Sequence, residues 1–194
     1  MSAAKGATIA ETYKARLNAL KNGGGRKILG IVGPPGCGKS TLAAALLDFL
    51  GDEAVAVPMD GYHLANVELA RLGRAGRKGA EDTFDSAGYV SLLRRLKNQQ
   101  ANEIVYAPEF RREIEEPIAN AILVFPETQL VITEGNYLLL DHGHWAGISD
   151  LLDEIWYVDI DHSIRRERLV KRHMHFGRSQ SAAEDWVANT DEPN

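Results

Sequence analysis

Apolar and polar residues along the chain follow two kinds of pattern, helical spacing and short apolar runs. The first is helical spacing, at Ile9, Tyr13, Leu17 and Leu20. This spacing predicts an amphipathic helix that ends before the glycines at 23–25. Residues 27–32 then form a short apolar run that enters Gly33, which is typical of a buried strand. A second amphipathic helix is predicted over 40–50, with Gly51 as its end.

The same criteria predict the elements of the remaining chain. We expect strands at 54–57, 103–107, 121–125, 129–133 and 155–160, and helices at 86–97, 162–176 and 182–188. Residues 59–85 lack periodicity, and a stretch of this length in a compact domain is either functional or disordered. The alternation of strands and helices predicts an α/β fold with a mainly parallel sheet and helices on both faces.

Composition adds limits on size and environment. With 194 residues, 44% hydrophobic and 25% charged, the chain has the profile of one globular domain, residues 1–194. Its net charge of −5 argues against a general nucleic-acid binder, and no apolar run is long enough to span a membrane. A single cysteine excludes a disulfide framework, and the first residues lack the apolar stretch of a signal peptide. We therefore expect a cytoplasmic protein.

Basic residues are concentrated in two segments. Residues 165–178 carry six Lys or Arg against one acidic residue, and residues 71–78 carry four basic residues and no acidic one. The remaining chain is strongly acidic. This separation predicts positive concave sites for a small polyanion on an acidic body.

One motif carries a specific chemistry. Residues 33–40 read G-P-P-G-C-G-K-S, which matches the P-loop pattern, and they lie between a predicted strand and a predicted helix. Backbone N–H groups of such a loop surround phosphates, while Lys39 contacts the β- and γ-phosphates and Ser40 ligates Mg²⁺. An accidental glycine-rich turn is the alternative. The predicted nucleotide-binding residues of this loop are Gly33, Pro34, Pro35, Gly36, Cys37, Gly38, Lys39, Ser40 and Thr41.

Two carboxylates follow predicted strands at the sheet edge that opens on a ligand. Asp60, in P-M-D-G-Y-H, could accept the proton of an attacking hydroxyl, or it could only form an Asp-Gly turn. Glu134, in V-I-T-E-G-N-Y, could hold Mg²⁺ in the manner of a Walker B acid, or it could be a simple strand-end residue.

Arginines on the predicted helix 162–176 form a third candidate group. Arg165, Arg168 and Arg172 share one helix face, where they could stabilise transition-state charge and close over the phosphates as a lid. A solvated basic face is the alternative. The six histidines lack metal-ligand spacing, and His63 is the one that we expect nearest the substrate.

Taken together, six segments of the chain resemble those of known P-loop kinases. They are G-P-P-G-C-G-K-S-T, P-M-D-G-Y-H, R-K-G-A-E-D-T-F-D, V-Y-A-P-E-F-R-R, V-I-T-E-G-N-Y-L and H-S-I-R-R-E-R-L-V-K-R-H. The family includes uridine kinase, phosphoribulokinase and bacterial pantothenate kinase. The nearest resemblance is to bacterial proteins described as nucleoside/nucleotide kinase family proteins or fructose transport system kinases. The resemblance covers 27–194, nearly the whole chain, and implies the three-layer sandwich of P-loop NTPases.

The resemblance also implies site roles. ATP is the donor with Mg²⁺ on Ser40 and Glu134, the catalytic group is Asp60, Lys39, Arg168 and Arg172, and Arg165 joins Arg168 at the nucleotide. It places a lid at about 162–180 and a substrate loop at about 59–86. For the acceptor we assign Asp60, Tyr62, His63, Arg77, Lys78, Phe110, Arg112, Asn136, Tyr137 and Asn189, the last of which matches a terminal W-x-x-N segment of the family.

The family resemblance says less about which acceptor the kinase phosphorylates. P-E-F-R-R at 108–112 departs from the P-x-Y-S-H stretch of pantothenate kinases and from the Tyr-Asp-Phe run of uridine kinases. Arg111 and Arg112 would suit an anionic acceptor, unless the neighbouring glutamates 113, 115 and 116 pair with them. We predict a kinase that phosphorylates a hydroxyl group of a metabolite, with a sugar as the predicted acceptor. A nucleoside or pantothenate kinase is the alternative.

Two non-catalytic functions are the remaining alternatives, a nucleotide-dependent switch and a degenerate ATP binder. A nucleotide-dependent switch is disfavoured because the chain has no N-K-x-D motif and has T-E-G where a D-x-x-G would stand. The sequence leaves open whether the chain forms a homodimer.

Overall fold

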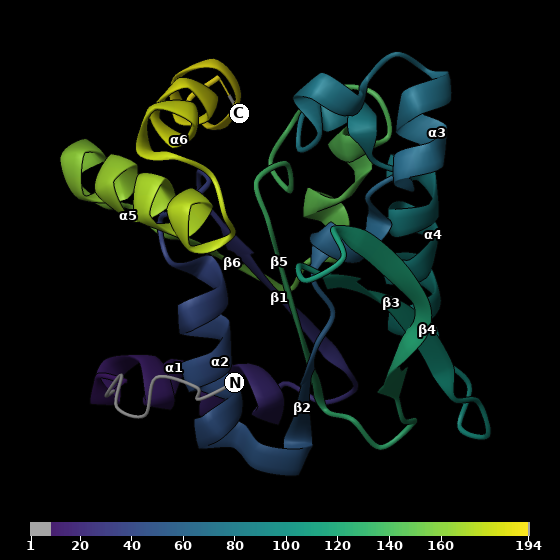
Figure 1. Cartoon of the computed structure of the whole chain (residues 1–194). Coiled ribbons are helices and arrows are strands. Elements are labelled where there is room, and N and C mark those ends of the chain that lie inside the picture. Colours follow the sequence, from purple (N-terminus) through teal and green to yellow (C-terminus); the bar gives the residue numbers. More distant parts are fainter. Residues whose placement is uncertain (1–8, 194) are drawn as a thin grey trace.

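A computed structural model describes residues 9–193 of the chain. At its centre lies a sheet of parallel strands in the order β2-β5-β1-β6 (Figure 1). These strands are β1 (Lys27–Val32), β2 (Ala54–Ala56), β5 (Leu130–Gly135) and β6 (Glu154–Tyr157). Because β1 and β5 lie in the middle and are covered on both faces, almost every residue of these two strands is buried.

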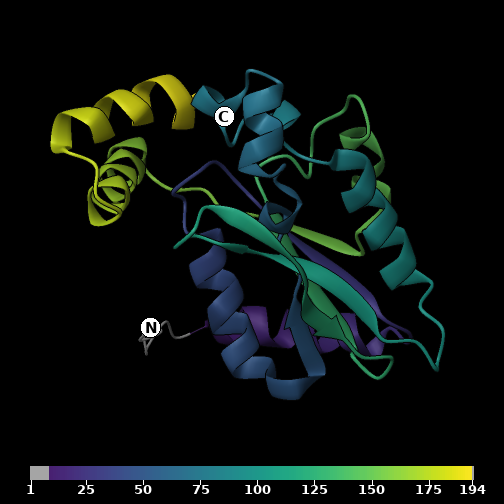
Figure 2. The same ribbon diagram turned by 45° about the vertical axis from the view of Figure 1, so that its right-hand side comes forward.

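Helices pack on both faces of this sheet, as the α/β prediction requires. On one face, α1 (Glu11–Asn22) and α2 (Lys39–Leu50) bury Leu17 and Leu46 against Leu29 and Ile31 of β1. On the other face lies α4 (Ser86–Lys97), which buries Tyr89 and other side chains against Ile28 and Val131. Successive residues of β1 thus point to opposite layers, and the predicted three-layer fold is confirmed (Figures 1 and 2).

The strands predicted at 103–107 and 121–125 do not join the central sheet. They form a separate antiparallel hairpin of β3 (Val105–Arg111) and β4 (Glu116–Val124), which lies beside α4 (Figure 2). Both strands extend further toward the turn than the pattern indicated. The pairing shifts register between Ala107 and Glu109, where Pro108 lacks an N–H to donate.

The segment without periodicity is ordered by short elements. It contains α3 (Asn66–Arg71) and three 3₁₀ turns, at 59–62, 75–77 and 81–83. Backbone bonds from Leu64 to Thr83 and from Asp85 to Tyr62 tie its two ends together. The six residues of α3 bury Leu69 alone, so this helix is too short to produce a visible hydrophobic period.

The C-terminal part lies over the carboxyl ends of the sheet strands (Figure 1). It consists of α5 (His162–His175), α6 (Gln180–Trp186) and a π-helical turn, Val187–Asp191. The predicted helix at 162–176 is confirmed, and it begins where the Asp161 carboxylate accepts the N–H of Ser163 at 2.8 Å. No helix in residues 9–193 is both long enough and apolar enough to cross a membrane.

Candidate active site

The glycine-rich loop joins β1 to α2 in a conformation that needs its glycines. Gly36 and Gly38 have φ angles of 80° and 104°, a region that side chains disfavour. A Cβ on Gly36 would lie 2.6 Å from Cγ of Leu169, so α5 packs directly against this loop. The loop therefore presents its backbone at the start of α2, as a phosphate-binding loop does.

Lys39 is held among neutral oxygen acceptors inside this loop. Its Nζ donates to the carbonyl oxygens of Gly33 and Pro34 at 2.9 and 3.1 Å and to Oδ1 of Asn136 at 2.7 Å. Burial lowers the pKa of Lys39. An ammonium group held by uncharged acceptors gains most when a phosphate oxygen approaches, because it then acquires a counter-charge.

Ser40 and Glu134 meet at the first turn of α2. The parallel pairing of β1 and β5 brings Glu134 beside Ile31, and the Ser40 hydroxyl donates to Oε1 of Glu134 at 2.7 Å. Burial, together with the negative charge of Asp60, raises the pKa of Glu134. A buried carboxylate and a hydroxyl are the hard oxygen donors that Mg²⁺ prefers when substrate phosphates and water complete its shell. The residues therefore fit the ion. Within 9–193, no cluster of three or more His, Cys, Asp or Glu forms a separate metal centre.

Asp60 faces the loop from the first 3₁₀ turn after β2. Its Oδ2 accepts a hydrogen bond from the Arg112 guanidinium at 3.2 Å, so the hairpin reaches across to this carboxylate. Its backbone oxygen accepts from Nδ1 of His63 at 2.8 Å. The His63 ring lies 4.0 Å from Phe84 and 4.6 Å from Phe110, centroid to centroid, and burial lowers the pKa of His63. His63 is thus a neutral ring that positions Asp60.

The arginines of α5 divide between two roles. Arg168 and Arg172 line the cavity described below. Arg165 is buried and donates to the carbonyl oxygen of Pro35 at 3.3 Å, so it supports the loop from behind and does not enter the cavity. Because Arg165 shares a helix face with Arg168 and Arg172, the sequence placed all three at the bound nucleotide. In the structure α5 crosses the loop, and only its later turns reach the cavity.

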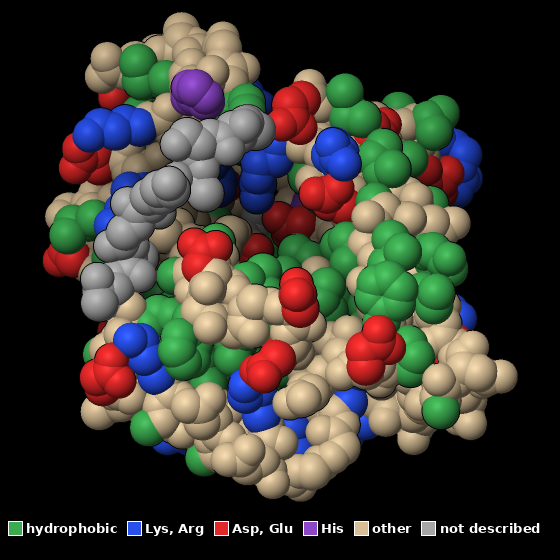
Figure 3. Space-filling model, turned by 90° about the horizontal axis from the view of Figure 1, so that it is seen from below, with side chains coloured by type: hydrophobic (Ala, Val, Ile, Leu, Met, Phe, Trp, Pro, Cys, Tyr) green, Lys and Arg blue, Asp and Glu red, His purple; other side chains and the backbone are tan. Residues whose placement is uncertain are grey.

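These groups surround one cavity of about 840 Å³. Figure 3 shows the molecule hollowed near its centre, where acidic and basic side chains meet. Lys39, Asp60 and Glu134 all line this cavity. The predicted site residues that also line it are Pro35, Gly36, Cys37, Gly38, Ser40, Thr41, His63, Lys78, Phe110, Arg112, Asn136, Arg168 and Arg172.

The other predicted residues lie outside the lining. Arg77 pairs with Asp82, Tyr62 packs on Tyr89, and Asn189 donates its side-chain amide back to the carbonyl oxygen of Asp185. Tyr137 donates its hydroxyl to the carbonyl oxygen of Gly79 at 2.6 Å, which places it beneath the 59–86 segment. Gly33 and Pro34 take part through the carbonyl oxygens that hold Lys39.

The glutamates do not neutralise the hairpin arginines in the way the sequence suggested. Arg111 pairs with Glu109 at 2.7 Å, two residues away on the same face of β3, and Arg112 pairs with Asp60. Glu116 instead accepts the backbone N–H of Asn66 at 3.0 Å. The hairpin turn between β3 and β4 points these side chains in different directions, which spacing alone could not reveal.

Sequence reasoning missed several residues of the cavity. Asp191 is buried in the π-helical turn and accepts from Nε2 of His173 at 2.7 Å, and both line the opening beside Trp186. A π-helical turn shifts the side chains that follow it around the helix, so the match of Asn189 to a family motif did not give the direction of its side chain. At the opposite end, Ile9, Tyr13 and Ala45 form an apolar wall, and no motif marked them.

Comparison with known proteins shows the family of the chain. The phosphoribulokinase / uridine kinase family profile matches residues 28–192. A Schizosaccharomyces pombe protein provisionally named as a uridine kinase is 36% identical over 190 residues, covering 93% of this chain and 80% of the relative. The Aspergillus versicolor ATP-dependent kinase-like protein notR′ is 38% identical over 141 residues, covering 69% of this chain and 82% of the relative.

Structural comparison gives the same assignment. A crystal structure of a Silicibacter sp. TM1040 protein, provisionally described as a fructose transport system kinase, superposes with a TM-score of 0.85 at 37% identity. The match covers 97% of this chain and 92% of that protein. This chain therefore belongs to the phosphoribulokinase / uridine kinase family and is a P-loop kinase that transfers a phosphoryl group to a hydroxyl of a small molecule.

Proposed function

We propose that the protein uses ATP and Mg²⁺ to phosphorylate a hydroxyl group of a sugar or sugar derivative, with Asp60 as the general base. One observation carries the proposal: Lys39, Glu134 and Asp60, from three separate segments, line the same cavity. Lys39 and Glu134 suit a nucleoside triphosphate with its metal ion, and Asp60 suits the hydroxyl group that attacks the γ-phosphate.

In this proposal the loop and α5 handle the phosphates. Lys39 exchanges its carbonyl acceptors for phosphate oxygens, and Arg168 and Arg172 approach from α5. Mg²⁺ bound near Ser40 and Glu134 would neutralise charge on the β- and γ-phosphates. Positioning and charge neutralisation supply most of the catalysis in phosphoryl transfer, since the protein does little covalent chemistry.

Asp60 then holds the acceptor hydroxyl and takes its proton. The Arg112 guanidinium occupies the Oδ2 side of Asp60 in this structure, so the acceptor must displace that contact or bind at the other oxygen. His63 fixes the Asp60 backbone through its Nδ1 hydrogen bond, which keeps the carboxylate aimed at the cavity.

We assign residues 162–180 as a lid and 59–86 as the substrate loop. Support for the lid comes from α5, whose Leu169 covers Gly36 while Arg168 and Arg172 reach the cavity. Closure would exclude water, which would otherwise hydrolyse the nucleotide. Support for the loop comes from Asp60, His63 and Lys78, which all line the cavity. A cytoplasmic location, where ATP is supplied, fits this function.

The name of the Silicibacter relative favours a sugar acceptor. A nucleoside is the second candidate, because the S. pombe relative is provisionally named as a uridine kinase and because Phe110 and His63 could stack on a base. ATP turnover against sugars, nucleosides and pantothenate separates these classes. Stimulation by none of these hydroxyl compounds would contradict both candidates.

Asp60→Asn tests the mechanism. We expect phosphoryl transfer to fall by about 10²-fold or more, the usual scale for loss of a general base. ATP binding, measured by calorimetry, should change little, because among residues 9–193 the Asp60 carboxylate forms its hydrogen bond with Arg112 and none with the P-loop. The matched control is Asp52→Asn, an exposed position in the turn after α2. Transfer that persists in Asp60→Asn would remove this residue from the mechanism.

A further inference from the structure

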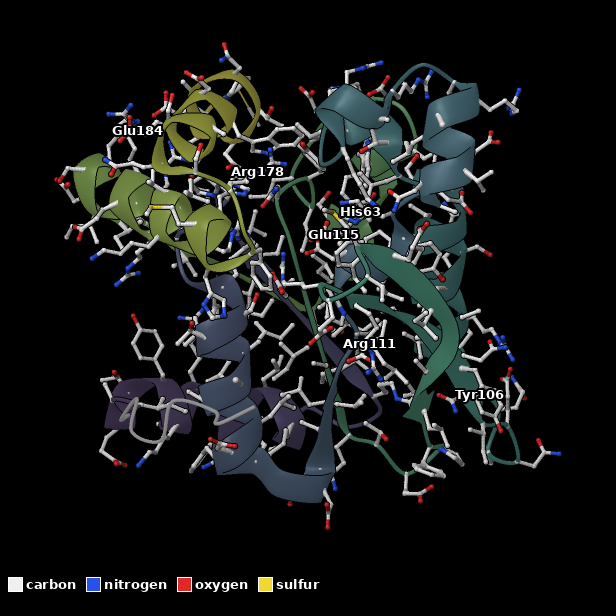
Figure 4. The ribbon with its side chains drawn as sticks, viewed as in Figure 1. His63, Tyr106, Arg111, Glu115, Arg178 and Glu184 are labelled. Atoms are coloured by element: carbon white, nitrogen blue, oxygen red, sulfur yellow. The ribbon has the colours of Figure 1, made fainter. Side chains whose placement is uncertain are left out.

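A second, smaller cavity adjoins the candidate active site. It has a volume of about 160 Å³ and lies between the hairpin turn and the C-terminal helices. Figure 4 shows its two sides, with Arg178 at the α5–α6 junction and Glu115 at the hairpin turn. Arg112, Arg172, His173 and Trp186 line both cavities, so an occupant of the small one would lie next to the acceptor end of the large one.

Three guanidinium groups line this small cavity. Arg112 contacts Asp60 at 3.2 Å, and Arg172 lies 3.8 Å from Asp191. Among residues 9–193 no carboxylate oxygen lies within 4 Å of a nitrogen of Arg178, whose guanidinium instead stacks on Trp186 at 3.9 Å from the ring centroid. A stacked guanidinium keeps its in-plane N–H groups available, so Arg178 is a preoriented donor.

The balance of charge around these arginines also favours an anion. Burial, and the positive charge of Arg112, lower the pKa of Arg172, which means that the two cations oppose each other. Glu115 is the one carboxylate among the lining residues, against three arginines, so the lining carries more positive than negative charge. A bound anion would relieve the repulsion between the guanidinium groups.

We propose that this small cavity binds an anionic group carried by the acceptor, so that the acceptor is an anionic polyol such as a sugar phosphate or a sugar acid. This inference rests on the proposed function and makes its acceptor class specific. The volume of the small cavity is that of about five water molecules at roughly 30 Å³ each, which leaves room for one phosphate or carboxylate group.

The position of Arg112 gives the subsite a second consequence. Arg112 comes from the hairpin, whereas Arg172 and Arg178 come from the lid, so one anion joins the two sides. An anion that draws Arg112 toward the small cavity also releases Oδ2 of Asp60. The base is then exposed when an acceptor of the right charge is bound, and water has less opportunity to react with ATP.

Turnover with matched acceptors tests the acceptor class. With ATP and the full chain, a ketohexose, its 6-phosphate and a hexonic acid are compared by ADP formation. We expect kcat/KM for at least one anionic compound to exceed that of the neutral sugar by about 10-fold or more, the effect of one charged hydrogen bond. Arg178→Ala should remove most of that preference. The control is Arg111→Ala, which alters a residue of the same hairpin that pairs with Glu109 (Figure 4).

A binding measurement separates the subsite from catalysis. The protein is saturated with a non-hydrolysable ATP analogue and Mg²⁺, and inorganic phosphate or acetate is titrated by calorimetry. Saturable binding that Arg178→Ala weakens about 10-fold supports the subsite, and the two ions distinguish phosphate from carboxylate. Binding that Arg178→Ala leaves unchanged, or no saturable binding of either ion, overturns it. Failure of the proposed function would instead appear as absent turnover while this binding persists.

Discussion

The nucleotide side and the acceptor side of the cavity are built in different ways. On the nucleotide side, nine consecutive residues from Gly33 to Thr41 and the adjacent Glu134 are attached to the two central strands. On the acceptor side, Asp60 and Lys78 come from the segment 59–86 and Arg112 comes from the hairpin turn, and both segments lie outside the central sheet. The first side is one motif on a rigid support, while the second is assembled by loops.

This difference explains why the two sides carry different information. Phosphate and metal binding need fixed backbone geometry, which buried parallel strands supply. Acceptor choice can vary with loop sequence while the sheet stays the same. The acceptor side also neutralises itself in this structure, through Arg112 on Asp60 and Arg77 on Asp82, whereas Lys39 is held by neutral oxygens.

Removal of the Lys39 charge, on the nucleotide side of the cavity, should have the largest effect on phosphoryl transfer. We expect Lys39→Met to reduce phosphoryl transfer by about 10³-fold, because a buried charge at the developing transition-state charge is lost. Steady-state kinetics with ATP measures it. Lys171→Met is the control, since Lys171 is exposed on α5 and pairs with Glu167. A loss smaller than about 10-fold would contradict the assigned role of Lys39.

A single methyl group on the P-loop tests how closely α5 packs on it. Gly36→Ala places a Cβ at a φ of 80° and against Leu169, so we expect ATP binding to weaken by about 10-fold or more. Calorimetry with an ATP analogue measures this. Gly76→Ala lies on the acceptor side with no atom within 4 Å of the added Cβ and should bind ATP normally. Equal affinities for the two variants would show that α5 does not constrain the loop.

Loss of Arg112, which contacts Asp60 on the acceptor side, should have a smaller effect, and this effect is an increase in ATP hydrolysis. We expect Arg112→Ala to raise ATP hydrolysis without acceptor a few-fold, because Oδ2 of Asp60 becomes open to water. Phosphate release in the absence of acceptor measures it, again with Arg111→Ala as the comparison. Hydrolysis that is unchanged or lower would mean that the Arg112 contact does not restrain the base.

The smallest predicted effect is that of Glu134 on the pH dependence of the free energy of unfolding. The raised pKa of Glu134 means that the folded state holds a proton which the unfolded state, with its pKa near 4.5, has lost. Stability from this group is therefore present below about pH 4.5 and is lost as the pH rises through the folded-state pKa. Glu134→Gln keeps an oxygen for the Ser40 hydroxyl but cannot ionise.

We therefore expect Glu134→Gln to gain stability relative to the natural chain as the pH rises from 5 to 8. Urea unfolding of both proteins without nucleotide or Mg²⁺ measures this gain. A gap that stays constant across the range, or narrows, would contradict the direction of the Glu134 pKa shift.

Much of the fold could be predicted from the sequence alone. The helix predicted at 86–97 and the strand predicted at 27–32 have the predicted limits, because each carries its own hydrophobic period and its own end signals. The helix at 66–71 was missed because six residues show no period. The family resemblance is confirmed by the match over 28–192, while the sugar acceptor stays a prediction.

The candidate site divides in the same way. Local sequence determined that a strand, a glycine-rich turn and a helix would present Lys39 and Ser40 to a phosphate, since neighbours in the chain build that geometry. Tertiary structure alone decided that Arg112 contacts Asp60, that Arg165 supports the loop from behind, and that Asn189 turns away while Asp191 turns inward. These outcomes depend on how segments distant in the sequence pack together and on where a helix forms a π-helical turn. The spacing of residues in the sequence predicts neither.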